Sequence, residues 1–207
     1  MRRKLAPGPV ALMLALTACA GGGDADQGGS APSPEVEESQ PISVGEVSTE
    51  MADPAGSVVG HATFTDTRSG IEVRVEVNGL PPGFHGVHLH EIGLCEADSP
   101  DPDEPSRSGD FLSAGPHLGS ADASHGQHAG DLPPLLMTEH GVGAGSSLVA
   151  VPKVEDLLDG DGTSLIIGEA PDNMGHIPSR YAPGGPDEET RSGGDAGARI
   201  VCGAIGP

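Results

Sequence analysis

The chain has 207 residues, of which 31 are acidic and 10 are basic, and its formal net charge at pH 7 is −21. Such acidity argues against nucleic acid as a partner, because phosphates are bound by Lys and Arg side chains, and it suits a soluble exported domain. With one Tyr, three Phe and no Trp, any hydrophobic core must be aliphatic.

The first 19 residues resemble a bacterial lipoprotein signal peptide. Residues 1–4 are cationic, residues 9–18 are mostly apolar, and residues 16–19 read Leu-Thr-Ala-Cys, the form of a lipoprotein processing box. The apolar run is too short to remain as a membrane-spanning helix. We therefore expect cleavage and lipidation at Cys19, with a plain secretory signal as the alternative.

This processing would place the mature protein outside the cytoplasm, bound to the cell membrane only through the lipid on Cys19. It would also remove the three basic residues at positions 2–4, so the mature chain would carry −24 rather than −21. Residues 20–56 are rich in Gly, Ser, Pro, Asp and Glu, which predicts a flexible tether. Only Val44 and Val47 suggest the beginning of a strand there.

Short strand-like segments fill the remaining domain, residues 57–207. Residues 71–77 alternate apolar and charged side chains, the pattern of a half-buried strand. Residues 91–134 and 171–197 are long loops rich in Gly and Pro, and loops of that length are usually functional. Short strands with little helix predict an all-β sandwich or barrel. The expected strands are residues 58–65, 71–77, 83–90, 135–138, 147–151, 164–167 and 199–202, with one helical turn at 154–158.

Residues 83–90 read Gly-Phe-His-Gly-Val-His-Leu-His. Side chains alternate faces along a strand, so His88 and His90 point to one face while Val87 and Leu89 point into the core. Two imidazoles on one face of a strand form half of a metal site.

The other half of this site is expected from the loop that follows. His117 and the run His125-x-x-His128-x-x-Asp131 supply three imidazoles and a carboxylate, a donor set suited to tetrahedral zinc. Four protein ligands close such a site, which indicates a structural ion rather than a zinc hydrolase. The alternative is a solvated His-rich loop that binds metals loosely.

Four motifs together resemble the copper/zinc superoxide dismutases, over about residues 58–205. They are the histidine strand, Gly-Pro-His at 115–117, His-Gly-Gln-His-Ala-Gly-Asp-Leu at 125–132, and Gly-Asp-Ala-Gly-Ala-Arg-Ile-Val-Cys-Gly at 194–203. The resemblance implies a Greek-key β-sandwich or barrel whose long loops hold copper and zinc. It allows both monomers and homodimers.

The resemblance also implies roles for individual residues. His117 would bridge the two metals, Arg199 would attract superoxide beside the copper, and His85 would bond to backbone. Asp172 would be the carboxylate that links the two halves of the centre. The implied ligands are His88, His90 and His117 for copper, and His117, His125, His128 and Asp131 for zinc.

Two cysteines, Cys95 and Cys202, remain once Cys19 is assigned to lipid. In an exported protein a disulfide between them is expected, and the resemblance implies the same pairing. This disulfide would close a loop of roughly 100 residues, and in the chain-entropy model closing such a loop stabilises the folded protein by roughly 4–5 kcal/mol. A free reactive pair is the alternative.

One position departs from the family pattern. Where the family places a further copper histidine, at the end of the strand at 164–167, this chain has Gly168. Three imidazoles suit Cu(I), whereas Cu(II) prefers four ligands in a tetragonal arrangement, so we expect a weakened copper site. Water, Glu169 and His176 are the available replacements, although a strand would turn Glu169 to the opposite face.

Three functions remain open at this point. The first is an exported superoxide dismutase, in which copper alternates between two oxidation states and His117 supplies a proton. The second is a non-enzymatic, zinc-stabilised protein that binds or buffers copper at the cell surface, which Gly168 favours. The third is a structural or partner-binding module that keeps the fold without copper.

Overall fold

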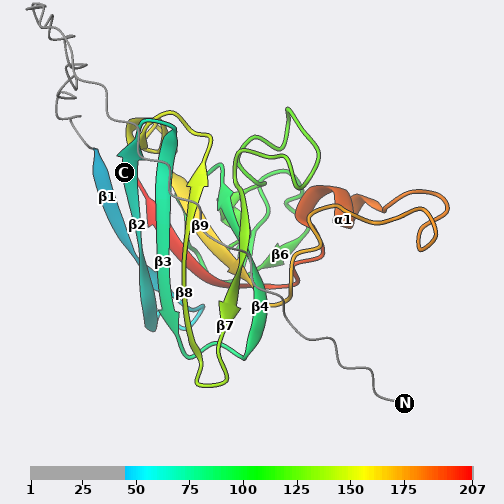
Figure 1. Cartoon of the computed structure of the whole chain (residues 1–207), viewed down its shortest axis with the longest axis horizontal. Coiled ribbons are helices and arrows are strands. Elements are labelled where there is room, and N and C mark those ends of the chain that lie inside the picture. Colours follow the sequence, from blue (N-terminus) through cyan, green and yellow to red (C-terminus); the bar gives the residue numbers. More distant parts are fainter. Residues whose placement is uncertain (1–44, 207) are drawn as a thin grey trace, which may run out of the picture. The chain divides into compact units, whose positions relative to one another are not determined.

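Eight antiparallel strands close into one barrel, in the order β1-β10-β9-β4-β7-β8-β3-β2 (Figure 1). The structure is a computed structural model and describes residues 45–206. Consecutive barrel strands are neighbours except where the chain crosses from β3 to β4 and from β8 to β9, as in Greek-key folds. The predicted all-β Greek-key barrel is confirmed. Its strands are β1 (Glu46–Ala52), β2 (Val58–Thr67), β3 (Gly70–Asn78), β4 (Gly83–His90), β7 (Asp131–Met137), β8 (Val142–Val149), β9 (Thr163–Gly168) and β10 (Arg199–Ile205).

The core follows the alternation seen in the sequence. On β3, Ile71, Val73 and Val77 are fully buried, and the charged residues between them face outward. Phe64 is the one aromatic side chain in the main core cluster of the described residues, and the other members are aliphatic or Met. Burial of these side chains supplies most of the driving force for folding.

The expected domain boundary at residue 57 is too late. Residues 46–52 form β1, which pairs with β2 along its whole length and reaches β10 through Ala52 and Cys202, so this segment closes the barrel. Composition hid the strand because Val47 and Met51 are its only large apolar side chains. The predicted signal peptide, Cys19 and the rest of the tether lie outside the described residues.

The predicted hairpin at 135–138 and 147–151 exists, but both of its strands are longer. β7 begins at Asp131, four residues earlier than expected. Pro133 and Pro134 concealed this part of the strand. They lie where the β4–β7 register shifts, between Leu132 opposite Val87 and Leu135 opposite His85, a position that tolerates the missing N–H of proline.

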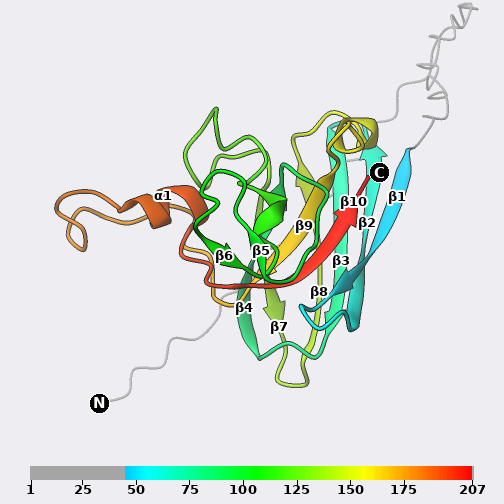
Figure 2. The same ribbon diagram turned by 180° about the vertical axis from the view of Figure 1, so that it is seen from behind.

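The two long loops carry small elements that position the site. The first contains β5 (Ser99–Pro100), β6 (Ser108–Gly109) and the short helix η1 (Leu112–Ala114). The second contains α1 (Glu188–Gly193), which was not predicted. Figure 2 shows β5, β6 and α1 on the same side of the barrel.

The predicted helical turn is present as η2 (Val154–Leu157). Within residues 45–206, no helix is long and apolar enough to cross a membrane.

Candidate metal centre

The histidine strand β4 lies between β7 and β9. Val87 and Leu89 pack in the main core, as their alternation predicted. His88 and His90 point to the other face, where the loops cover them and leave only 3% and 1% of each residue exposed. His85 is also buried, and its two ring nitrogens face the backbone oxygens of Gly168 and Pro81.

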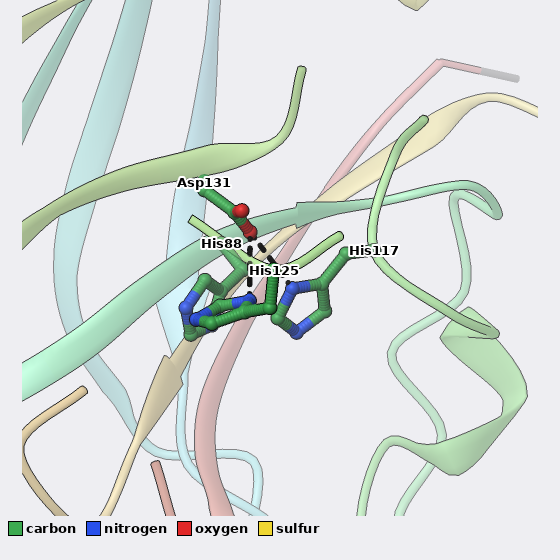
Figure 3. Close-up of side chains that lie close together, drawn as sticks. All are labelled: His88, His117, His125 and Asp131. Carbon is green, nitrogen blue, oxygen red and sulfur yellow. Dashed lines mark hydrogen bonds and ion pairs between the residues drawn. The ribbon is translucent and has the colours of Figure 1, made fainter. Parts of the chain in front are cut away.

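Three imidazoles converge on a single carboxylate oxygen. The Nδ1 atoms of His117, His125 and His128 lie 3.0, 3.2 and 3.2 Å from Oδ1 of Asp131; Figure 3 shows two of these rings beneath the carboxylate. Four ligands at zinc bond lengths define a tetrahedron with edges of about 3.3 Å. The three distances from Oδ1 therefore match edges of a tetrahedral zinc site.

An unsatisfied buried atom points to the same conclusion. Nδ1 of His125 is buried and has no hydrogen-bond partner, while Nε2 of the same ring lies 2.8 Å from Oδ1 of Asp172. Nε2 must donate to that carboxylate, so in the neutral ring Nδ1 carries a lone pair aimed at Asp131. A cation between the two would satisfy both groups.

Backbone amides hold the Asp131 carboxylate in place. Oδ2 accepts from the N–H groups of Gly126 at 2.6 Å and His128 at 3.0 Å, which leaves Oδ1 facing the three rings. Burial raises the pKa of Asp131, but the nearby imidazoles of His117 and His125 outweigh this and hold the pKa far below its usual range. The group is therefore a carboxylate throughout the physiological range.

The imidazoles of the centre are tuned in opposite directions. Burial lowers the pKa of His117 to about 4, so this ring is neutral at pH 7. Burial also acts to lower the pKa of His125, but the nearby carboxylates of Asp131 and Asp172 raise it to about 9. Without a metal ion, His125 is the protonated ring of the pair.

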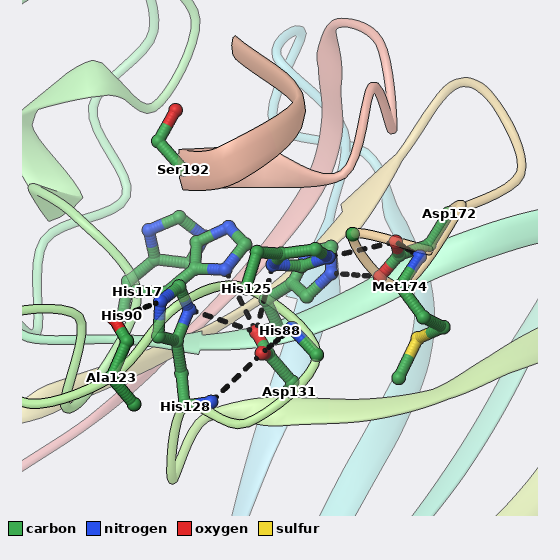
Figure 4. A network of polar contacts seen from close by, with 12 residues as sticks. His88, His90, His117, Ala123, His125, His128, Asp131, Asp172, Met174 and Ser192 are labelled. Atoms are coloured by element: carbon green, nitrogen blue, oxygen red, sulfur yellow. Dashed lines mark hydrogen bonds and ion pairs between the residues drawn. The ribbon is translucent and has the colours of Figure 1, made fainter. Parts of the chain in front are cut away.

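Asp172 joins the two halves of the centre. Its buried carboxylate lies 2.7 Å from Nε2 of His88 and 2.8 Å from Nε2 of His125 (Figure 4), and it also accepts from the N–H of Met174. Burial raises the pKa of Asp172, but the two imidazole bonds hold it well below its usual range. The carboxylate thus fixes which nitrogen of each ring faces the metal.

The copper side offers three imidazole nitrogens. Nε2 of His88 is taken by Asp172, Nδ1 of His90 bonds to the oxygen of Gly115 at 2.8 Å, and Nδ1 of His117 bonds to Asp131. The free atoms are therefore Nδ1 of His88 and Nε2 of the other two. The ring of His117 lies 4.0 Å from that of His88 and 4.8 Å from that of His90, measured between centroids.

The structure groups these residues somewhat differently from the expected sets. Donor atoms of His88, His117, His125 and Asp131 all lie within 4.8 Å of one another. His128 reaches this group through Asp131 and through the rings of His117 and His125, and His90 reaches it through the rings of His88 and His117.

Arg199 is fixed beside the copper side. Its Nη1 donates to the oxygen of Phe111 at 2.8 Å, and its Nη2 donates to the oxygen of Gly115 at 2.9 Å. Burial lowers the pKa of Arg199 to about 10, so the guanidinium is charged at neutral pH. Sequence reasoning missed these two carbonyl partners, because a backbone acceptor leaves no signature in side-chain type.

The fourth copper position holds no side chain among the described residues. A Cβ placed on Gly168 would lie 2.5 Å from the carbonyl oxygen of Ala196, closer than a real Cβ can approach. Glu169 and His176 are both exposed. Three imidazoles are therefore available on the copper side, and position 168 offers no further ligand.

The metal residues open into a cavity of about 890 Å³ between the two loops. His88, His90, His117 and Arg199 lie in its wall, together with charged and small side chains of both loops. Seven carboxylates face three guanidinium groups there, so the lining has an excess of negative charge. The acidic residues are Asp101, Asp103, Glu104, Asp110, Glu188, Glu189 and Asp195, and the basic ones are Arg107, Arg191 and Arg199.

The disulfide between Cys95 and Cys202 is present, which confirms the expected pairing and removes the alternative of a free pair. The two cysteines pack with Phe111, Ala114 and Ile166 in a small second core. The bridge therefore ties the first long loop to β10, three residues from Arg199.

A Greek-key barrel whose strand β4 and long loops gather five histidines, two aspartates with buried carboxylates and one arginine defines a class of all-β metalloproteins with a two-metal centre. A sequence profile described as copper/zinc superoxide dismutase matches residues 58–205. The chain belongs to the copper/zinc superoxide dismutase family, which uses copper and zinc.

Relatives from bacteria agree with this assignment. A protein named superoxide dismutase [Cu-Zn] from Mycolicibacterium paratuberculosis is 39% identical over 177 residues, which cover 82% of this chain and 78% of that protein. The protein of the same name from Mycobacterium tuberculosis is 36% identical over 168 residues, covering 75% and 68%.

Solved structures agree as well. The Cu/Zn superoxide dismutase from Brucella abortus matches with a TM-score of 0.59 at 25% identity, covering 78% of this chain and 99% of that one. A superoxide dismutase-like protein from Bacillus subtilis matches with a TM-score of 0.58 at 28% identity, covering 76% and 97%.

Proposed function

We propose that this protein is an exported superoxide dismutase with an intact structural zinc site and a weakened copper site. It would convert superoxide to oxygen and hydrogen peroxide. The convergence of His117, His125 and His128 on one oxygen of Asp131 supports the zinc site. The naming of its relatives supports the reaction.

Each residue would have a defined task in this reaction. His88, His90 and His117 would hold copper, which supplies one-electron chemistry that zinc lacks. The guanidinium of Arg199 would bind the superoxide anion at the wall of the cavity. His117, whose Nδ1 faces the zinc side, would hold and release a proton at Nε2.

Superoxide decay tests this proposal directly. Protein loaded with zinc and copper should accelerate the decay, and His90→Ala should abolish the effect because one of only three imidazoles is lost. His140→Ala is the matched control, since this histidine is exposed and lies in the β7–β8 turn. Equal activity in the wild type and in His90→Ala would contradict the assignment.

A second candidate is supported by one specific observation. Gly168 offers no ligand, and the oxygen of Ala196 occupies the space that a side chain there would need. The protein would then be a zinc-stabilised surface lipoprotein that binds copper without turnover. Stoichiometric copper binding without any effect on superoxide decay would identify this function.

We also propose that Cys19 anchors the protein on the extracytoplasmic side of the membrane. The support is the Leu-Thr-Ala-Cys sequence after a short apolar run. A Cys19→Ala variant should lose metabolic labelling with a radioactive fatty acid and leave the membrane fraction. Membrane association that survives this change would refute the anchor.

A further inference from the structure

Gly168 and Gly86 together form a slot for Ala196. Val87 pairs with Ile167 across β4 and β9, so the next residues on the two strands, Gly86 and Gly168, lie side by side. A Cβ on Gly86 would come within 2.7 Å of the Ala196 Cβ, and one on Gly168 within 3.1 Å of it. The second loop thus packs directly on two strands that have no side chains at this point.

Backbone hydrogen bonds hold the loop in the slot. Ala170 donates to Ala196 at 2.8 Å, and Glu169 donates to Ala198 at 2.8 Å. Asn173 donates to Gly194 at 2.9 Å. On the other side, Nδ1 of His85 lies 2.8 Å from the oxygen of Gly168. The carbonyl that blocks a side chain at 168 is therefore itself fixed by a bond within the loop.

The cavity next to this slot favours cations over anions. Its lining carries seven carboxylates and three guanidinium groups, and a cavity lined by one sign of charge concentrates ions of the other sign. The buried His90 and His117 line this cavity, and because their Nδ1 atoms are engaged by Gly115 and Asp131, their Nε2 atoms remain available to a metal ion. Charge and donor atoms therefore select the same kind of ligand.

We propose that the copper side is a three-imidazole site for Cu(I), closed to a fourth protein ligand by the packing of Ala196 on Gly168. His88, His90 and His117 are its ligands. Cu(I) accepts low coordination numbers, whereas Cu(II) prefers four donors in a tetragonal arrangement. This inference rests on the proposed copper site and assigns the oxidation state that the site retains.

Separate titrations with copper in its two oxidation states test the proposal. The zinc-loaded full chain is titrated with Cu(I), under anaerobic conditions against a chromophoric Cu(I) chelator, and with Cu(II), followed by electron paramagnetic resonance. We expect one Cu(I) per chain, lost in His90→Ala, and no tetragonal Cu(II) spectrum. His176→Ala and His140→Ala should bind as the wild type does, and loss of copper in His176→Ala would overturn the proposal.

Two substitutions at one position test the slot. Gly168→Ala and Gly168→His should lower the melting temperature by similar amounts, roughly 2–12 °C, because the Cβ is the obstruction in both. A Gly168→His variant of wild-type stability with a tetragonal Cu(II) spectrum would show that the slot is open. If that variant does not fold, Gly168→Ala and the wild-type copper titrations still decide the question.

The outcomes separate this inference from the proposed function. Rapid superoxide decay together with retained Cu(II) would overturn the Cu(I) preference and leave the dismutase standing. Retained Cu(I) without superoxide decay would support the preference and remove the dismutase. Failure to bind copper as Cu(I) or as Cu(II) would overturn both the Cu(I) preference and the dismutase.

Discussion

Asp131 shows how much of the centre depends on a single side chain. One of its oxygens is fixed by two backbone amides, and the other meets three imidazole nitrogens. The spacing His-x-x-His-x-x-Asp predicted this donor set. It did not indicate which nitrogen of each ring faces the ion, because the partner of the other nitrogen decides this. For His125 that partner is Asp172, which comes from the second long loop, and for His128 it is the backbone oxygen of Ala123.

Replacement of Asp172 by Asn should weaken zinc binding by roughly 10–100-fold, the usual effect of losing such an orienting carboxylate. The amide oxygen of Asn can accept from one ring, but its NH₂ group cannot accept from the other. Competition with a chromophoric zinc chelator measures the change. Asp161→Asn is the control, since this carboxylate is exposed, and equal zinc affinities in the two variants would contradict the assigned role.

Zinc binding at pH 7 should release about one proton, because metal binding requires deprotonated ligands. His125, with its pKa raised to about 9, gives up that proton, whereas His117, with its pKa lowered to about 4, has none to lose. Zinc affinity should therefore rise with pH and level off above about 9. Calorimetry in two buffers of different ionisation enthalpy counts the protons, and a count of zero would refute the protonation state of His125.

The raised pKa of His125 also makes the stability of the metal-free fold fall with pH, whereas zinc affinity rises with pH. A raised pKa stabilises the folded protein below the ordinary pKa of 6.5, and this contribution is lost as pH rises through about 9. Zinc should therefore increase the melting temperature more at pH 9 than at pH 6.

At the scale of elements, the sequence located the strands that carry alternating or wholly apolar residues. β3, β4 and β9 were predicted within about two residues of their observed bounds. β1 was indicated only by Val44 and Val47 as the beginning of a strand, because its partners and not its own composition make it a strand. α1 was missed because it has only six residues. The slot for Ala196 was predicted only in part. The sequence showed Gly168, but it did not show that Ala196 packs against this residue.

Truncation of Met51 should show that β1 belongs to the core. Met51 is fully buried, so Met51→Ala should reduce the free energy of unfolding by about 2–5 kcal/mol. Val58→Ala, at a position that is 57% exposed, should change it by about 0.5 kcal/mol or less. Denaturant titration compares the two, and similar losses would contradict a closed barrel.

Removal of the disulfide should cost about 4–5 kcal/mol, because the bridge closes a loop with a sequence separation of 107. Cys95→Ala, Cys202→Ala and the double variant should be equally destabilised, since any one of them opens the same loop. Denaturant titration under oxidising conditions measures this loss. A double variant much less stable than either single one would mean that packing, and not loop closure, is responsible.

At the scale of the whole molecule, the net charge of −21 opposes the approach of superoxide. Added salt screens this repulsion, since the Debye length falls from roughly 30 Å at 0.01 M to 8 Å at 0.15 M. Any dismutation should therefore become faster with salt over this range, by up to roughly tenfold. A double Glu188→Gln, Glu189→Gln variant should respond less, and a rate that falls with salt would show that Arg199 dominates the field.

The carbonyl of Gly115 accepts from both His90 and Arg199. The imidazole and the guanidinium therefore share one hydrogen-bond acceptor, and neither can be repositioned without disturbing the other. Attempts to retune anion affinity by exchanging the arginine will also alter the metal's surroundings, so that kinetic and spectroscopic changes in such variants have a common origin.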